Sequence, residues 1–335
     1  RRFAQDDPRR FLAGHPDGAI LDEAQRVPEL FSYLQGWVDN QKEVKFVLSG
    51  SQNFLLMERI TQSLAGRVGI LTLLPFDSGE LPVQTYDSLE AFTWRGAYPP
   101  LFDRNIPAKL FFDNYVQTYL ERDVREMQQV GSLTQFHRFL LLCAARAGQQ
   151  LNFSSLASDA GISPNTAKSW LSILEASWIV FLLPPYYRNF NKRLTKAPKL
   201  YFYDTGLLAH LLGVDRPENL HTHFAYGAMV ENAVVVELLK QRVHRGIRPA
   251  CYYFRDSLGR EVDLLIEEEG KLKAIEIKAS HTPHPDMTKN LRYWQELTGT
   301  PATDSHVIYG GATRIQTAWG DILPWREAMA EKSRV

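Results

Sequence analysis

The sequence predicts an α/β protein in three parts: a parallel sheet at the N-terminus, a helical middle, and a C-terminal unit with the element order α-β-β-β-α-β. Residues 1–75 alternate short apolar runs with helical stretches, as parallel α/β sheets do. Residues 134–183 repeat apolar positions at helical spacing. Within residues 225–311, a long helix is followed by strand candidates that are separated by turns.

The bulk composition is that of an ordinary soluble globular protein, with 44% hydrophobic and 23% charged residues. Lys+Arg 38 equals Asp+Glu 38, so any interaction with nucleic acid must rest on local patches. The two cysteines, Cys143 and Cys251, lie in apolar sequence and favour reduced core residues over a disulfide. No apolar run approaches the ~18 residues needed to cross a bilayer. We therefore expect a cytoplasmic protein that has no membrane contact.

In the N-terminal part, strands are expected at residues 18–21, 44–49 and 69–74, with a helix at 27–40. Asp22 and Glu23 directly follow the first strand. At the carboxyl edge of a parallel sheet, one carboxylate can hold Mg²⁺ through water and the other can orient an attacking water. The second strand ends in small polar residues, from Ser49 to Asn53, which suits a strand that senses a γ-phosphate. These patterns predict half of a nucleotide-hydrolysing site.

The other half of such a site, the phosphate-binding loop, is not found in the sequence. The pattern G-x-x-x-x-G-K-[ST] does not occur, and the Gly270-Lys271 pair lacks the upstream glycine. The chain begins at Arg1. We therefore interpret it as beginning inside an ATPase domain, after the Walker A loop, and expect that these residues alone do not hydrolyse ATP.

The middle of the chain carries a helix-turn-helix pattern. After a boundary rich in Gly and Pro, an amphipathic helix is expected at about residues 108–128. Within residues 152–180, Gly161 suits the turn, Ser163 the cap of the second helix, and Pro164 its first position. Apolar strands at 178–183 and 199–203 would add a wing. The outward face of the second helix carries one basic residue, Lys168.

The proposed wing is basic and aromatic. Between residues 184 and 203 there is no acidic residue, and aromatic side chains are interleaved with cations. Cations that neutralise phosphates, next to rings that stack on bases, are typical of a nucleic-acid surface. The alternative is a solvated loop whose aromatic residues belong to the core. The candidate nucleic-acid contacts are Arg188, Lys192, Arg193, Lys196, Lys199 and Lys168.

The C-terminal part carries the most complete candidate site. A helix at residues 227–242 places Glu231 early on one face, and Glu276 and Lys278 share a face of one strand because they lie two residues apart. Asp263, on the adjacent strand, can reach the same place. Phosphodiester cleavage uses carboxylates to bind Mg²⁺ and a lysine to position or deprotonate water. The alternative is a structural Glu–Lys pair on a strand whose neighbours are apolar.

Several motifs run along the chain in order, and together they resemble a known family. They are Leu-Asp-Glu-Ala-Gln at 21–25, Leu-Ser-Gly-Ser-Gln-Asn at 48–53, Leu-Ala-Gly-Arg at 64–67, Tyr-Leu-Glu-Arg-Asp-Val at 119–124, Tyr-Phe-Tyr-Asp-Thr-Gly-Leu at 201–207, Gly-Ala-Met-Val-Glu-Asn at 227–232, and the Asp263…Glu276-Ile277-Lys278 set. The chain resembles prokaryotic AAA-type ATPases that carry a C-terminal domain of unknown function (DUF4143) related to the PD-(D/E)XK nucleases.

The resemblance implies the fold and the roles of the residues. Residues 1–82 would be a partial P-loop (AAA-type) core, 83–130 a helical lid or linker, 131–203 a winged helix-turn-helix, and 204–335 a restriction-endonuclease-like domain. The implied ligands are ATP, Mg²⁺ and DNA, and self-association stays open. Implied catalytic residues are Asp22, Glu23, Glu231, Asp263, Glu276 and Lys278; metal ligands Asp22, Asp263 and Glu276; nucleotide contacts Ser49, Asn53, Arg67 and Arg122.

Two functions remain open at this point. The first is an ATPase coupled to a DNA-associated, Mg²⁺-dependent nuclease. The second is a regulatory ATPase whose nuclease-like domain only binds nucleic acid or a protein partner. Geometry discriminates between them, because hydrolysis requires Glu231, Asp263, Glu276 and Lys278 to converge.

Overall fold

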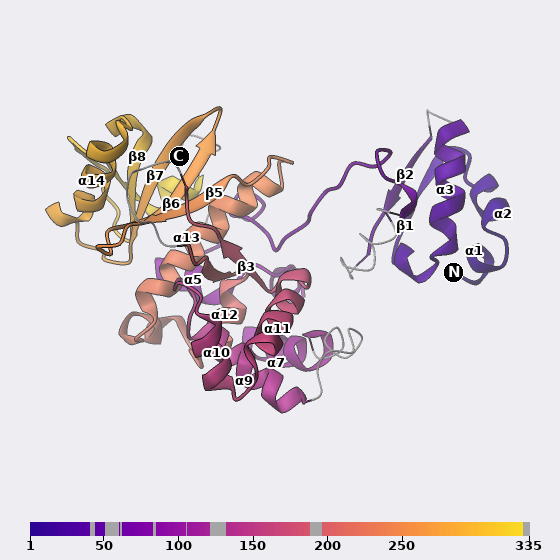
Figure 1. Ribbon diagram of the computed structural model, residues 1–335, viewed down its shortest axis with the longest axis horizontal. Helices are drawn as coiled ribbons and strands as arrows, with labels where there is room; N and C mark the ends of the chain where they lie inside the picture. The colour runs from indigo at the N-terminus through magenta and orange to yellow at the C-terminus, as the bar shows by residue number, and fades with distance from the viewer. Residues whose placement is uncertain are drawn as a thin grey trace. The chain divides into compact units, whose positions relative to one another are not determined.

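The computed structural model describes residues 1–40, 44–50, 60, 62–82, 85–104, 106–120, 132–187 and 196–330. The chain divides into two compact units, Arg1–Leu71 and Thr72–Val335 (Figure 1). The break between the compact units falls at Leu71, eleven residues before the domain end expected from the sequence, which stays a prediction. The physical reason is that residues 72–82 pack on the second unit: Leu74 is buried in its core, and the backbone N–H of Phe76 donates to the carbonyl of Ala97.

The first unit contains a two-stranded parallel sheet that is covered on one face by helices. Strand β1 pairs in parallel with β2, with Leu21 opposite Leu48. Leu12, Phe31 and Leu34 form the centre of its apolar core. The elements are α1 (Arg2–Asp6), α2 (Pro8–Ala13), β1 (Gly18–Leu21), η1 (Ala24–Arg26), α3 (Glu29–Asn40) and β2 (Lys45–Leu48).

The alternation of strand and helix predicted for this part is present, although the third strand is not. Residues 69–74 form neither helix nor strand, and the side chains of Leu71 and Leu73 are exposed. An apolar run becomes a strand only where a neighbouring strand can pair with its backbone.

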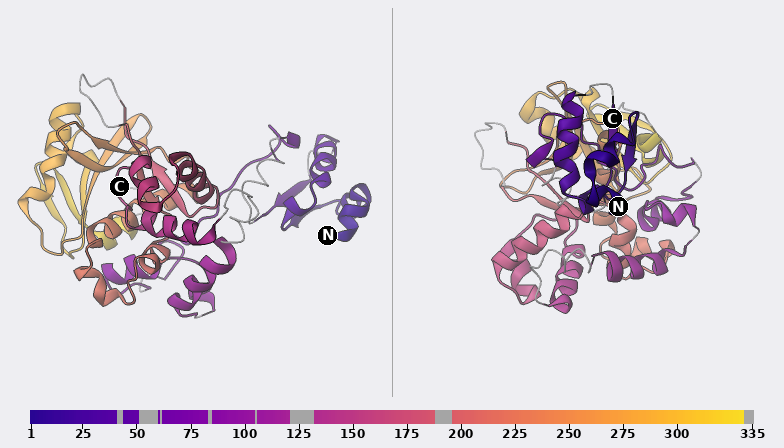
Figure 2. Two further views of the ribbon diagram at one scale, coloured as in Figure 1. Left: turned by 60° about the horizontal axis from the view of Figure 1, so that its bottom comes forward. Right: turned by 90° about the vertical axis from the view of Figure 1, so that its right-hand side faces the viewer.

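The second unit begins with a helical region. Its elements are α5 (Leu89–Arg95), α6 (Pro100–Asp103), α7 (Ala108–Asn114), the π-helix η2 (Tyr115–Leu120), α9 (Leu133–Ala144), α10 (Phe153–Ala160), α11 (Pro164–Ala176), β3 (Val180–Leu183), β4 (Lys199–Phe202), α12 (Thr205–Leu211) and η3 (Pro217–Thr222). Figure 2 shows this region from two further sides. The helix expected at 108–128 is present through α7 and η2 within the described residues.

Helices α10 and α11 have the predicted layout. Gly161 ends α10 in the left-handed conformation, with a φ of 71°, which a glycine adopts without steric cost. The Ser163 side chain accepts the Thr166 N–H at 3.0 Å, and Pro164 starts α11. Ala167 and Leu171 face the core. The antiparallel pair β3–β4 follows, with Val180 opposite Phe202.

The C-terminal region is built on a mixed six-stranded sheet with the order β5-β6-β7-β8-β10-β9. Its elements are α13 (Tyr226–Val243), β5 (Cys251–Arg255), β6 (Glu261–Glu268), β7 (Lys271–Lys278), η4 (Pro285–Thr288), α14 (Lys289–Thr298), η5 (Ala302–Asp304), β8 (Ser305–Tyr309), β9 (Ile315–Thr317), β10 (Gly320–Pro324) and α15 (Trp325–Ala330). The predicted α-β-β-β-α-β order is present, and β9, β10 and α15 extend it.

Two helices cover opposite faces of this sheet (Figure 1). Residues of α13 share one apolar cluster with Ile275 and Ile277 of β7. Residues of α14 share another cluster with Ala274, the residue adjacent to Ile275. Successive residues of a strand point to opposite faces, so the helices lie on different sides. The whole chain is thus mixed α/β, as expected.

The hairpin β3–β4 is attached to the edge of this sheet. The Tyr186 N–H donates to the Tyr253 carbonyl at 2.8 Å, and the Tyr253 N–H donates to the Pro184 carbonyl at 3.1 Å. From α13, the amide of Asn232 accepts the Phe202 N–H and donates to its carbonyl, both at 2.8 Å. Strand β4 is therefore fixed against α13 and the sheet.

Both cysteines are buried free thiols, which agrees with their expected place in the core. None of the helices in the described part of the chain combines the length and apolar character that crossing a bilayer requires.

Candidate active site

Three carboxylates from two elements form the centre of the site. Glu231 lies in the second turn of α13, and Glu261 and Asp263 lie two residues apart on β6. One oxygen from each lies within 4.8 Å of the other two. The spacing on β6 places both of its carboxylates on one face, opposite the first turns of α13.

Lys278 links Asp263 to Glu276 on β7. Its Nζ lies 2.6 Å from Glu276 Oε2 and 3.9 Å from Asp263 Oδ2. The other Glu276 oxygen accepts the Asn290 amide of α14 at 3.3 Å. Asp263 Oδ2 also accepts the Ile277 N–H at 2.8 Å, which fixes the aspartate to the neighbouring strand. Asp263, Glu276 and Lys278 therefore converge, and Glu231 lies next to Asp263.

Lys199 reaches the same carboxylates from β4. Its Nζ lies 2.8 Å from Glu231 Oε1 and forms an ion pair with Glu261 Oε1. The residue is 2% exposed. This corrects its assignment to the basic nucleic-acid surface, because docking of the hairpin buries Lys199 in the acidic site. Tyr201, also on β4, donates its hydroxyl to Glu231 Oε1 at 2.5 Å.

Burial makes these carboxylates hard to ionise. Desolvation, together with the charge of Asp263, raises the pKa of Glu231 to about 7 and the pKa of Glu276 to about 8. Burial also raises the pKa of Asp263. For Lys278, burial opposes the charged form, but Glu276 and Asp263 hold its pKa above the ordinary value. The site thus concentrates negative charge that an added cation would stabilise.

The donor set fits the Mg²⁺ that the family resemblance implies. Mg²⁺ prefers hard oxygen ligands, and one or two carboxylates with water complete its usual shell. Glu231, Glu261 and Asp263 supply such oxygens within 4.8 Å of one another. The cations Lys199, Lys278 and Arg255, which pairs with Glu261 Oε2 at 2.8 Å, partly offset these carboxylates and Glu276.

Sequence reasoning missed Glu261. The signal was available, because Glu261 and Asp263 share a strand face just as Glu276 and Lys278 do. The E-x-D spacing on β6, between β5 and β7, carries the same kind of signal as the E-x-K spacing on β7.

In the first unit, Asp22 and Ser49 lie together at the carboxyl ends of β1 and β2. The Ser49 hydroxyl donates to Asp22 Oδ1 at 2.5 Å, and the Ser49 N–H donates to the Leu21 carbonyl. Glu23 has a φ of 53°, and its carboxylate accepts from Gln25 at 2.9 Å and pairs with Arg26 at 3.1 Å. The predicted pairing of the two strand ends is therefore present.

Arg67 lies away from this pair and binds Asp39 with two hydrogen bonds, of 2.6 and 3.1 Å. Asn53 and Arg122, the other proposed nucleotide contacts, lie outside the described residues.

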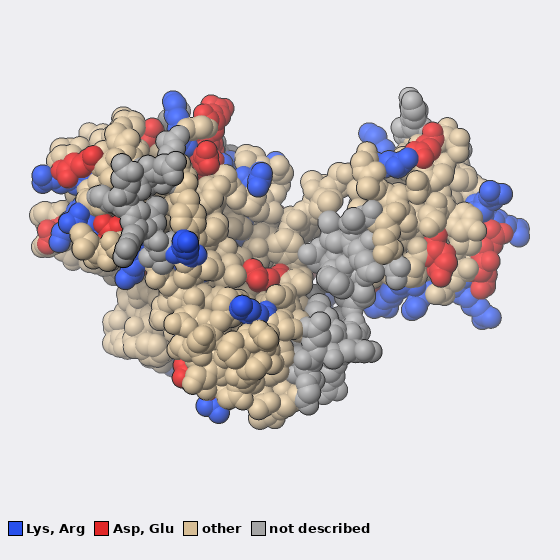
Figure 3. All heavy atoms as spheres, viewed as in Figure 1, with Lys and Arg blue, Asp and Glu red and all other residues tan. Residues whose placement is uncertain are grey.

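Of the proposed nucleic-acid contacts, Lys168 on α11 and Lys196 before β4 are exposed. Arg188, Lys192 and Arg193 lie outside the described residues. On the face drawn in Figure 3, the region around α9–α11 carries few charged side chains. Among the described aromatic residues between 184 and 203, Tyr187 is exposed, and those that are buried are Tyr186, Tyr201, Phe202 and Tyr203.

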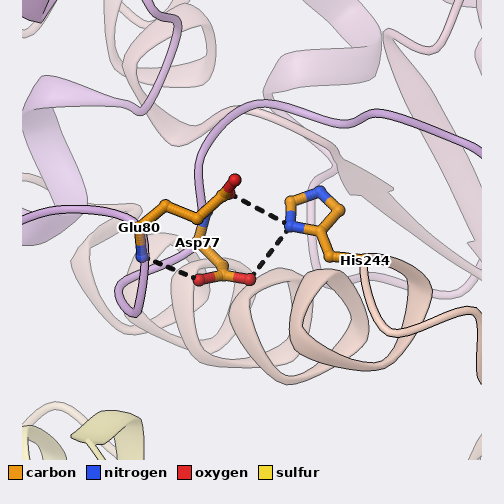
Figure 4. A group of neighbouring side chains, drawn as sticks. All are labelled: Asp77, Glu80 and His244. Carbon is orange, nitrogen blue, oxygen red and sulfur yellow. Dashed lines mark hydrogen bonds and ion pairs between the residues drawn. The ribbon is translucent and has the colours of Figure 1, made fainter.

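A second group of acidic residues and a histidine lies near the end of α13 (Figure 4). His244 Nδ1 lies 2.9 Å from Asp77 Oδ2 and 3.2 Å from Glu80 Oε2. Its Nε2 accepts the Leu74 N–H at 3.3 Å, so Nδ1 carries the proton and donates. With both ring nitrogens engaged, this group anchors residues 74–80 to α13 rather than offering a metal ligand.

Three family models match consecutive parts of the chain. Residues 2–81 match the model of an AAA domain, residues 86–218 that of a domain of unknown function (DUF8612), and residues 226–328 that of a domain of unknown function (DUF4143). No solved structure matches the chain.

Two curated relatives are similar to most of the chain. They are Uncharacterized protein Rv2008c of Mycobacterium tuberculosis and Uncharacterized protein Mb2031c of Mycobacterium bovis. Each is 32% identical over 281 residues, which cover 83% of this chain and 62% of the relative. The chain thus spans less than two thirds of the length of these relatives. Together the matches support an AAA-type, ATPase-like domain over residues 2–81 followed by a DUF4143 domain over residues 226–328.

Proposed function

We propose that the C-terminal region is a Mg²⁺-dependent phosphodiesterase that acts on nucleic acid, and that the whole protein couples it to ATP hydrolysis in its AAA-type domain. The observation that carries the proposal is the convergence of Glu231, Asp263, Glu276 and Lys278 in one largely buried site. Perturbed carboxylates next to a fixed lysine are typical of catalytic sites and unusual in a structural core.

Each residue has a distinct role in hydrolysis. Asp263 and Glu231 would hold the metal ion, which supplies charge stabilisation and a more acidic water. Glu276 keeps Lys278 in place at 2.6 Å, and the lysine ammonium donates to the water or to a phosphate oxygen. The water oxygen bonds to phosphorus, the ester P–O bond breaks, and the leaving oxygen takes a proton. Exposed Lys168 and Lys196 are available to phosphates elsewhere on the strand.

The ATP-hydrolysing half of the proposal concerns the whole protein. The hydrogen bond between Ser49 and Asp22 supports a nucleotide site at the ends of β1 and β2, in which Asp22 would hold Mg²⁺. Binding of ATP also needs a phosphate-binding loop, and the 335 residues contain no such motif.

The proposal is tested by cleavage of labelled single- and double-stranded DNA and RNA with Mg²⁺ or Mn²⁺. We expect cleavage by the wild type and a loss of at least about 100-fold in Asp263→Asn and Lys278→Ala. The matched control is Asp256→Asn, because Asp256 is also buried but accepts its hydrogen bonds from Leu258, Arg260 and Tyr293. Absence of cleavage on every substrate, or equal cleavage by the Lys278 variant, would refute the proposal.

A second candidate function is binding without cleavage. It is favoured by the ion pairs of Lys199 and Lys278, which offset carboxylates of the cluster without a metal. This function predicts nucleic-acid or protein binding that is unchanged by EDTA, with no cleavage under any condition. Fluorescence anisotropy with labelled oligonucleotides, with and without EDTA, measures the binding, and the cleavage assay separates the two candidates.

A further inference from the structure

Lys199 is a cation that enters the carboxylate site from outside the C-terminal domain. It lies on β4, within the match to DUF8612, whereas the DUF4143 match begins at residue 226. The side chain is 3% exposed, and its ammonium contacts Glu231 and Glu261. These are two of the three carboxylates in the proposed metal-binding group.

The position of Lys199 is fixed by hydrogen bonds on both sides. Its strand is paired with β3, and the next hairpin residues are tied to α13 through Asn232. The Tyr253 hydroxyl donates to the carbonyl of Ala197, two residues before Lys199. The ammonium also lies 5.5 Å from the centre of the Tyr253 ring. The backbone at Lys199 is therefore held in place within β4, and the change that the ammonium can undergo is one of side-chain position.

An ammonium and a divalent cation on the same carboxylate oxygen repel each other, so each weakens the binding of the other. A metal bound to Glu231 Oε1 would lie about 2.1 Å from that oxygen, which Lys199 already approaches to 2.8 Å. The repulsion between the two cations is weakly screened there because little water surrounds them. Without a metal, the same lysine bridges the two glutamates and offsets their charge.

We infer that Lys199 is the affinity-determining residue of the metal site: it occupies Glu231 and Glu261, and a divalent cation binds these carboxylates only when the ammonium withdraws. The inference rests on the proposed metal site. It makes the β3–β4 hairpin a control element, because any ligand that shifts this hairpin changes the affinity of the C-terminal region for the metal.

The first experiment compares Mn²⁺ binding to the full chain by calorimetry for the wild type, Lys199→Gln and Arg255→Gln. We expect Lys199→Gln to bind Mn²⁺ about tenfold more tightly or better, since one competing charge is removed. Arg255→Gln is the matched control. Its guanidinium contacts the other Glu261 oxygen and is 41% exposed, so the affinity should change by less than about threefold.

Equal or weaker Mn²⁺ binding by Lys199→Gln overturns the inference and leaves the metal site standing. If no variant binds Mn²⁺ at millimolar concentration, the metal site and the inference both fail. A second measurement uses the wild type and so does not depend on folding of the variant. In a Mn²⁺-soaked crystal, Lys199 Nζ should lie beyond hydrogen-bond distance from Glu231 and Glu261. A metal on these carboxylates with Lys199 still bound to both would contradict the inference.

Discussion

Asp263 is the residue on which the candidate site depends. One of its oxygens accepts the Ile277 N–H from β7, so the side chain cannot turn away from the strand that carries Glu276 and Lys278. Its charge also raises the pKa of both Glu231 and Glu276, after the larger effect of burial. A single aspartate therefore connects the carboxylates contributed by α13, β6 and β7.

We predict that replacing the Asn232 side chain by alanine causes a large loss of stability. The side chain is fully buried and makes two hydrogen bonds to the backbone of Phe202. Asn232→Ala leaves a buried N–H and C=O unpaired, which should lower the free energy of unfolding by about 2–5 kcal/mol. Chemical denaturation checks this, with the exposed Asn165→Ala, expected within about 0.5 kcal/mol of wild type, as the control. Equal effects of the two substitutions would contradict the prediction.

At Glu90, we predict a pH-dependent contribution to stability. Burial opposes its ionisation, but hydrogen bonds from Tyr226 and His281 lower the pKa of Glu90 to about 2. A folded-state pKa below the unfolded value gives stability that is present above about pH 4.5 and lost as the pH falls towards 2. The difference in Tm between wild type and Glu90→Gln should therefore shrink between about pH 6 and 3. A constant difference over this range would argue against the role of Glu90.

Some residues of the site could be predicted from sequence and others could not. Glu276 and Lys278 share a strand face by spacing alone, and Asp263 follows from the adjacent strand of a hairpin. The basic residues around Lys199 in the sequence predict that it lies on a basic surface. Its burial arises from pairing of Tyr186 with Tyr253, a contact between distant segments that no local pattern encodes.

At the scale of elements, helices with complete local signals formed where the sequence predicted them. The α10–α11 pair carries a glycine, a serine cap and a proline in order, and the structure uses each of them. The strand expected at residues 69–74 has apolar composition, but no strand among the described residues pairs with it. Local signals thus predict helix ends well, whereas strands depend on what lies beside them.

We predict opposite effects for alanine at two exposed glycines. Gly161 has a φ of 71°, so Gly161→Ala should destabilise the chain by about 1 kcal/mol. Gly227 lies in α13 and an added Cβ would meet no atom within 4 Å, so Gly227→Ala should stabilise by about 0.5–1 kcal/mol. Thermal denaturation measures both, and a shift of the same sign for the two would contradict the assignment of their backbone conformations.

At the scale of the whole molecule, the chain consists of two units that meet at Leu71 in sequence. Residues 74–80 belong to the second unit through several polar contacts. Lys240 Nζ donates to the Phe76 carbonyl at 2.6 Å, and Glu237 accepts the Ser78 N–H at 2.7 Å. Both Lys240 and Glu237 are buried, so loss of these partners would leave buried polar groups unpaired and lower the stability of the second unit.

The position of this boundary gives a further prediction. A chain that begins at Thr72 should unfold cooperatively with the same Tm as the second unit of the full chain. In a chain that begins at residue 85, the groups that contact residues 74–80 are exposed or left without a partner. Its free energy of unfolding should be lower by about 3 kcal/mol or more. Calorimetry of both truncations tests this, and equal stability of the two would place the boundary at the later position.

The central claim is that Asp263, Glu276 and Lys278 form a metal-dependent phosphodiesterase site. Hydrolysis in H₂¹⁸O tests this claim most directly. With Mg²⁺ and an oligonucleotide, the wild type should place one ¹⁸O atom on each new terminal phosphate, as mass spectrometry would show. Asp263→Asn, purified in the same way, should give no labelled product. Absence of labelled product with the wild type, or the same yield from Asp263→Asn, would contradict the account.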